Sequence, residues 1–242
     1  MSSAAGRQAI TSIRTLRQLA GLVDQSLLHP DAFLEEFDSL CKGAKKYRFA
    51  SVAVNPAAVP YCASQLEGTG VLVCAAVGFP FGQNTVRTKV FETRDAIANG
   101  AREIDYVLNI VELKAGHWGY ILDEMVRVKE TAAPLVVKVI LETCFLTQDE
   151  KRRACELAVD AGLDFVKTST GFGPGGATVE DVSLMRRVVG DQLGVKASGG
   201  MSNLDKVLAM VTHGATRIGT RFGVEIVEEA RRKGWPAESH DA

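Results

Sequence analysis

Short apolar runs alternate with longer amphipathic stretches along nearly the whole chain. The short runs are rich in β-branched residues, which is typical of strands buried in a parallel sheet. Each is followed by a segment of helical periodicity, so the pattern indicates repeated strand and helix units. Eight strands are predicted, at residues 21–28, 49–55, 71–77, 104–109, 135–141, 163–168, 194–197 and 217–220.

Polar residues and glycines mark where several of the helices begin and end. The sequence TQDE at 147–150 has the form of a capping box ahead of a helix over 154–161, and Gly162 follows as a C-terminal cap. Gly100 ends a helix over 90–98 in the same way. These signals predict helices between the strands.

The number of units indicates one fold class. Eight strand and helix pairs in 242 residues match the size of a TIM barrel, and no Pro- or Ser-rich linker divides the chain. We therefore predict an α/β fold, a single TIM (β/α)8 barrel domain over residues 1–242 with an extra, exposed N-terminal helix at residues 10–19. In such a barrel the active site lies at the C-terminal ends of the strands.

Two predicted strands end in a lysine followed by small residues and glycines. Lys167 stands in VKTSTGF at 166–172, and Lys196 stands in GVKASGG at 194–200. An amine at the inner end of a buried strand is partly desolvated, which lowers its pKa and lets it attack a carbonyl. Most single lysines are solvated surface charges. The matching pair of strand ends therefore carries the hypothesis that both lysines face one pocket.

An acidic residue, Asp105, lies between apolar neighbours in EIDYV at 103–107. Buried carboxylates are rare without a partner, and an acid beside amines can transfer protons. The alternative is a structural salt bridge from Asp105 to Lys138 or Lys196. Asp24 and Lys138 are expected close to the same strand ends.

The glycine-rich segment GFGPGG at 171–176 has two interpretations. It fits the GxGxxG pattern of dinucleotide folds between a strand and a helix. However, Pro174 lies inside the turn, and the acid expected about 20 residues further on, Asp191, falls in a loop. A tight turn whose backbone N–H groups approach a phosphate explains the glycines better.

Composition limits the classes of molecule that the protein is expected to bind. The formal net charge of −1 gives no general attraction to nucleic acid or to an anionic membrane, and no run reaches the length of a membrane span. The five cysteines lack CxxC spacing and the four histidines lack HExxH. We expect a small-molecule partner, no catalytic metal, no cofactor and a cytoplasmic location. Arg7, Arg14 and Arg17 precede the first acid, a pattern that organellar transit peptides share.

Several motifs resemble one known family, the deoxyribose-phosphate aldolases, over residues 22–224. The resemblance implies a metal-independent class I aldolase on a TIM barrel, which reversibly cleaves 2-deoxy-D-ribose 5-phosphate to D-glyceraldehyde 3-phosphate and acetaldehyde. It implies Lys167 as the Schiff-base lysine, Lys196 as the ammonium that lowers its pKa, and Asp105 as the residue that moves protons with a water. The motifs are VKTSTGF at 166–172, VKASGG at 195–200, EID at 103–105, GFP at 78–80 with Lys89 and Glu92, and KVILET at 138–143.

The sequence also departs from this family. Gln25 stands where a histidine is common, Ala53 where many relatives have cysteine, and Arg221 and Phe222 where a serine pair helps to hold the phosphate. Because the last two loops of a TIM barrel usually bind phosphate, we expect Arg221 there and Phe222 below the loop. A solvent-facing Arg221 is the alternative. The predicted substrate or phosphate contacts are Asp24, Lys138, Thr168, Thr170, Gly171, Gly199, Gly200, Gly219 and Arg221.

The sequence favours an aldolase and leaves alternatives open. They are a Schiff-base aldolase for another phosphorylated or unphosphorylated aldehyde, a non-catalytic barrel that binds a phosphorylated metabolite, and a dinucleotide-binding oxidoreductase. Pairing of both lysines with Asp105 favours the aldolase, because anion binding needs no carboxylate. The oligomeric state is not determined, and a homodimer is one assembly we consider.

Overall fold

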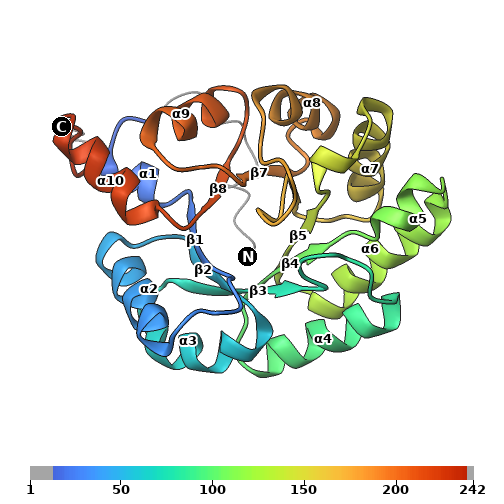
Figure 1. The fold of residues 1–242 in the computed structure, drawn as a ribbon, viewed down its shortest axis with the longest axis horizontal. Helices are drawn as coiled ribbons and strands as arrows, with labels where there is room; N and C mark the ends of the chain where they lie inside the picture. Colours follow the sequence, from blue (N-terminus) through green and yellow to red (C-terminus); the bar gives the residue numbers. More distant parts are fainter. Residues whose placement is uncertain (1–12, 239–242) are drawn as a thin grey trace.

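The computed structural model describes residues 13–238, in which eight parallel strands close into a barrel (Figure 1). The strands follow one another in sequence order, and β8 closes the barrel by pairing with β1. They are β1 (Val23–Leu27), β2 (Ser51–Val54), β3 (Leu72–Val77), β4 (Glu103–Val107), β5 (Val136–Ile140), β6 (Phe165–Lys167), β7 (Gly194–Ser198) and β8 (Arg217–Thr220). All eight predicted strands are confirmed, with ends that differ by two residues at most.

Helices surround the barrel on its outer face (Figure 1). None of those within residues 13–238 is long and apolar enough to cross a membrane. The α-helices are α1 (Leu16–Ala20), α2 (Leu34–Tyr47), α3 (Val59–Leu66), α4 (Val86–Ala98), α5 (Ile110–Lys114), α6 (Trp118–Ala132), α7 (Gln148–Asp160), α8 (Val179–Val189), α9 (Leu204–Thr212) and α10 (Gly223–Arg232), and short 3₁₀ turns cover Pro56–Ala58 and Thr143–Phe145.

The predicted helix ends are present where the capping residues stand. Helix α7 begins after Thr147, whose hydroxyl accepts a hydrogen bond from the Glu150 amide, while the Glu150 carboxylate accepts one from the Thr147 amide at 2.7 Å. Gly162 and Gly100 follow helices α7 and α4 with positive φ angles of 66° and 109°. The capping box and both glycine stops are therefore confirmed.

The predicted N-terminal helix is corrected. Residues 10–12 lie outside the described residues, and the helix begins only at Leu16, because Thr15 and Gln18 form a capping box there. It is not exposed on its apolar side, since Leu16 and Leu19 are buried and α1 packs on α10. The amide of Leu16 also donates a hydrogen bond to the carbonyl of Pro236 at 2.9 Å. The start of α1 is thus held by the segment that follows α10.

The two faces of the strands have different chemistry, which strand β4 illustrates. Ile104 and Tyr106 are fully buried and belong to the apolar core, whereas Glu103 and Asp105 alternate with them and are equally buried. Side chains alternate between the faces of a strand, so the two acids share one face. Taking a charge out of water costs several kcal/mol per ion unless partners compensate. The barrel interior must therefore supply cations to these acids.

The closed barrel also decides the interpretation of the glycine-rich loop. A dinucleotide fold of the kind that carries GxGxxG is an open, doubly wound sheet, whereas all eight strands here form one closed barrel. Asp191 lies in the turn after α8 and not at a strand end. The dinucleotide interpretation is therefore wrong.

Candidate active site

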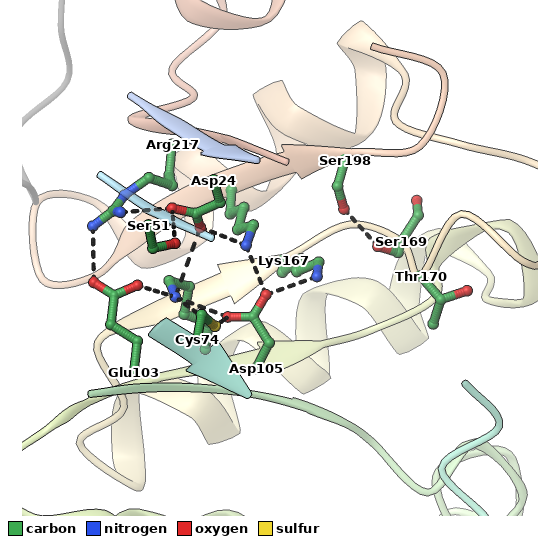
Figure 2. Close-up of polar contacts among 12 residues, drawn as sticks. Asp24, Ser51, Cys74, Glu103, Asp105, Lys167, Ser169, Thr170, Ser198 and Arg217 are labelled. Carbon is green, nitrogen blue, oxygen red and sulfur yellow. Dashed lines mark hydrogen bonds and ion pairs between the residues drawn. The ribbon is translucent and has the colours of Figure 1, made fainter. Parts of the chain in front are cut away.

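Carboxylates and cations alternate around a closed ring inside the barrel. Figure 2 shows Asp24, Glu103, Asp105 and Arg217 meeting there. We call the six members the charged ring; in order around it, they are Asp105, Lys196, Asp24, Arg217, Glu103 and Lys138. The successive N–O distances, starting from Asp105 and Lys196 and ending between Lys138 and Asp105, are 2.7, 2.5, 2.7, 3.2, 2.6 and 2.8 Å. The ring has three carboxylates and three cations, and so carries no net formal charge.

Lys167 is attached to this ring as an additional cation. Its Nζ lies 2.7 Å from Asp105 Oδ2, the same oxygen that Lys196 Nζ contacts at 2.7 Å. Lys196 has a second carboxylate in Asp24, whereas Lys167 forms an ion pair with Asp105 alone among residues 13–238. Lys167 stands at the end of β6, where the sequence placed it. A protonated Lys167 would therefore add a charge to a neutral buried cluster.

The pKa values follow from this difference in partners. Burial lowers the pKa of Lys167, and the neighbouring Lys196 ammonium lowers it further against the opposing effect of Asp105. Burial also acts on Lys196, but Asp105 and Asp24 raise its pKa above the ordinary lysine value. Lys138 likewise has a raised pKa despite its burial, owing first to Asp105. Lys167 is therefore the lysine of the three that loses its proton first.

The pKa of Asp105 is held well below its usual range. Burial would raise it, but Lys138, Lys167 and Lys196 outweigh that effect. The Cys74 thiol also lies 3.1 Å from Asp105 Oδ1, and burial raises the pKa of this thiol, so it stays neutral. Asp105 is accordingly a carboxylate in the free protein, with its basicity suppressed by three cations.

A cleft of about 1240 Å³ opens above Lys167 at the C-terminal ends of the strands. It runs along β1, β6, β7 and β8 and reaches helix α2, so its position is that of a TIM-barrel active site. Nine of the predicted site residues line it. They are Asp24, Lys167, Thr170, Gly171, Lys196, Gly199, Gly200, Gly219 and Arg221.

The two glycine loops that follow β6 and β7 pack directly against each other. A Cβ on Gly176 would lie 2.3 Å from the carbonyl oxygen of Gly199, so only glycine fits at that contact. The amide of Ala177 donates to the carbonyls of Ser198 and Gly199 at 3.0 and 3.1 Å. This contact fixes the two lysine strand ends side by side.

Gln25 connects strand β1 to the loop after β8. Its Nε2 donates to the carbonyl of Arg221, and its Oε1 accepts from the amide of Gly223, both at 2.8 Å. The Arg221 side chain is exposed at the cleft, with its guanidinium 4.7 Å from the centroid of the Phe222 ring. Phe222, which was expected below the loop, packs against the apolar core and also lines the cleft. Gln25 thus orients the backbone on which Arg221 stands.

Two predicted substrate contacts lie below the cleft. Lys138 is fully buried in the middle of β5, where Glu103 and Asp105 bind its amine, and it does not line the cleft. Thr168 is fully buried, and its hydroxyl bridges the amide and the carbonyl of Ser198 at 3.0 Å each. Neither side chain lines the cleft, so direct contact with a substrate stays a prediction for both. Asp105 also lies below the cleft and reaches it through Lys167.

Three residues of the site were not predicted. Arg217 and Glu103 complete the charged ring from the first residues of β8 and β4. Glu103 stands two positions before Asp105, and this spacing on one strand face was a usable signal. Glu142, after β5, has a positive φ of 52°; it stands in the KVILET motif at 138–143, from which no role for its side chain was predicted.

Glu142 holds the segment that follows Lys167. Its carboxylate accepts hydrogen bonds from the hydroxyl of Thr170 and from the Thr170 amide at 3.3 Å. Burial raises the pKa of Glu142, while the Thr170 hydrogen bonds oppose that rise. Thr170 lines the cleft, so Glu142 positions one wall of it.

Residues 19–228 match the model of the DeoC/LacD family aldolases. The chain belongs to this family.

Named relatives cover nearly the whole chain. The chain is 54% identical over 217 residues to the deoxyribose-phosphate aldolase of Bacteroides thetaiotaomicron. This alignment covers 88% of the present chain and 91% of the relative. The chain is 51% identical over 223 residues to the deoxyribose-phosphate aldolase of Caldanaerobacter subterraneus subsp. tengcongensis, with 91% and 96% covered. The solved structure of the deoxyribose phosphate aldolase from Aeropyrum pernix, described as tetrameric, superposes with a TM-score of 0.82 at 28% identity and covers 93% of this chain and 95% of its own.

Glu142 generates a prediction about stability. Replacing Glu142 by Ala leaves the buried amide and hydroxyl of Thr170 without an acceptor, which costs about 1–3 kcal/mol in the free energy of unfolding. Glu142→Gln keeps one acceptor oxygen and should lose clearly less. Urea unfolding of both variants measures the difference. Equal losses in the two variants would mean that the hydrogen bonds to Thr170 do not hold this segment.

Proposed function

We propose that this protein reversibly cleaves 2-deoxy-D-ribose 5-phosphate to D-glyceraldehyde 3-phosphate and acetaldehyde. The single observation that carries the proposal is the Lys167 amine, which lines the cleft, is attached to a neutral charged ring and has a lowered pKa. The names of the relatives supply the substrate. The roles given to individual residues below are part of the same proposal.

The first step is attack of neutral Lys167 on the aldehyde carbon of the open-chain sugar. The new C–N bond gives a carbinolamine. Its hydroxyl takes up a proton and leaves as water, which gives a protonated imine on Lys167. Because the pKa of Lys167 is lowered by burial and by Lys196, more of this amine is neutral near pH 7 than for an ordinary lysine. Lys196 stays protonated and supplies that repulsion.

The second step breaks the bond between C2 and C3 of the sugar. The C3 hydroxyl gives up its proton, its electrons form the carbonyl of glyceraldehyde 3-phosphate, and the electrons of the broken bond move into the protonated imine to give an enamine. Protonation of the enamine at C2 and addition of water then release acetaldehyde and Lys167. We assign proton transfer through a water to Asp105. Its basicity rises when Lys167 loses a proton, because one of its three cations is then neutral.

The phosphate is assigned to the loops after β7 and β8, at the start of helix α10. Gly199, Gly200 and Gly219 line the cleft there, and the first residues of α10 lie beside them. A helix N-terminus and backbone amides favour an anion. The Arg221 guanidinium, at the same edge, adds a cation that can donate two parallel N–H hydrogen bonds to one phosphate.

The other functions are less well supported by the residues. A barrel that only binds a phosphorylated metabolite would not need Asp105 beneath two lysines at 2.7 Å. A related Schiff-base aldolase for a different aldehyde would keep the same amine, and the Arg221 and Phe222 pair is where its specificity would differ. Homodimer formation and a cytoplasmic location stay predictions of the sequence, as does the lack of a metal or cofactor.

Covalent trapping identifies the nucleophile. Treatment with acetaldehyde and borohydride should leave an ethyl group on Lys167, because this neutral amine is reachable from the cleft. Mass spectrometry of the digested protein locates the group, and Lys138, which does not line the cleft, is the internal control. A label confined to a different lysine would remove Lys167 from its proposed role.

Kinetics of an Arg221 variant test the phosphate site. Arg221→Ala should lower kcat/KM for 2-deoxyribose 5-phosphate by about 1.5–3 kcal/mol, the scale of a charged hydrogen bond. Unphosphorylated 2-deoxyribose should be nearly unaffected. Arg87→Ala, which removes an exposed arginine from α4, is the matched control. Equal losses on both sugars would place Arg221 in support of the loop, and no loss on either would mean that it faces solvent.

A further inference from the structure

Two members of the charged ring lie on the side away from the substrate. Arg217 is the first residue of β8 and Glu103 the first residue of β4, so both stand at the N-terminal end of the barrel. Neither lines the cleft that opens at the C-terminal ends. Their side chains are only 14% and 2% exposed, and they bind each other at 3.2 Å. Neither residue can touch a substrate held above Lys167.

We propose that Arg217 and Glu103 are positioning residues that set the proton affinity of Lys167 by fixing the net charge of the ring beneath it. This inference rests on the proposed function of Lys167 and deepens it. With both residues present the ring is neutral, and the proton on Lys167 is the uncompensated charge. The aldolase chemistry needs a neutral Lys167, so the far side of the ring helps to prepare the nucleophile.

The geometry connects both residues to Asp105 by short steps. Arg217 binds Asp24, which binds Lys196, and Lys196 binds Asp105 Oδ2. Glu103 binds Lys138, which binds Asp105 Oδ1. Asp105 is the residue that contacts Lys167. Each charge is therefore held in place by the next one, with little room for water, and Coulomb interactions in such a setting are strong.

The titratable groups nearest to Lys167 come from several strands and from the segment after β5. Asp105 from β4 and Lys196 from β7 contact it or its partner directly, and burial raises the pKa of Cys74 from β3, so this thiol adds no charge. Glu142 after β5 has a raised pKa owing to burial, and the Lys167 charge opposes that rise. The ring supplies the remaining charges through Asp24 from β1 and Lys138 from β5.

Removing one charge at a time gives effects of opposite sign. Glu103→Gln leaves the ring with one excess positive charge, which disfavours the protonated form of Lys167 and lowers its pKa. Arg217→Gln leaves one excess negative charge and raises that pKa. Each change should be on the order of one pH unit. The double variant restores a neutral ring and should return the pKa close to that of the parent protein.

Acetylation by acetic anhydride measures the amine directly. The rate of acetylation of Lys167, followed by mass spectrometry across a pH series, has its midpoint at the pKa of the amine whether or not the protein is an aldolase. We expect a lower midpoint for Glu103→Gln, a higher one for Arg217→Gln and a near-parental one for the double variant. Glu124→Gln is the control, because Glu124 is a fully buried carboxylate paired with Lys89 at 2.7 Å outside the ring, and it should leave the midpoint unchanged.

The outcomes separate this inference from the proposed function. Folded single variants that shift the midpoint in the same direction, or not at all, overturn the role of the ring, even if acetaldehyde and borohydride label Lys167. Opposite shifts support it, even if that label falls elsewhere and the aldolase proposal fails. If Arg217→Gln does not fold, Glu103→Gln must still lower the midpoint and the double variant must reverse it. If only the double variant folds, a midpoint that departs from the parental value overturns the inference.

Discussion

The site depends on one carboxylate, Asp105, that is shared among three lysines. One oxygen of Asp105 binds Lys167 and Lys196, and the other binds Lys138. No single carboxylate can neutralise three ammonium groups, so the outcome is decided by what else each lysine binds. Lys138 and Lys196 have further carboxylates in Glu103 and Asp24. Lys167 does not share them, which is why it is the lysine suited to lose its proton.

The barrel makes this arrangement possible, because its strands deliver charged side chains to one enclosed space from all sides. A buried ion pair alone is weak support for stability, since desolvation offsets much of the Coulomb energy. A closed ring of alternating charge satisfies each member twice, which reduces that cost. The packed glycine loops above the ring, where Gly176 meets Gly199, then hold β6 and β7 in register. Structure and reactivity are thus produced by the same contacts.

The sequence predicted the fold well because the barrel repeats one simple pattern. Apolar runs and caps such as Thr147 located the strands and helices, and the two lysine motifs and Asp105 located the centre of the site. The partners of Asp105 were harder to predict. Lys138 looked like a substrate contact, since the sequence does not show how deep a residue lies within a strand. Arg217 was missed because a charged residue beside a turn is usually solvated.

The local corrections have similar physical reasons. Helix α1 begins at Leu16 because Thr15 caps it there, and residues 10–12 of the predicted helix lie outside the described part of the chain. Gln25, to which the sequence assigned no function, binds both the Arg221 carbonyl and the Gly223 amide across the barrel mouth.

Of the three lysines that bind Asp105, Lys167 is the one that becomes neutral. Nitrogen-15 NMR of lysine side chains, with Lys138, Lys167 and Lys196 assigned by conservative replacement, tests it most directly. We expect the Lys167 amine to lose its proton at a pH below the ordinary lysine pKa while Lys138 and Lys196 remain ammonium groups; loss of the proton from Lys196 before Lys167 would contradict the account.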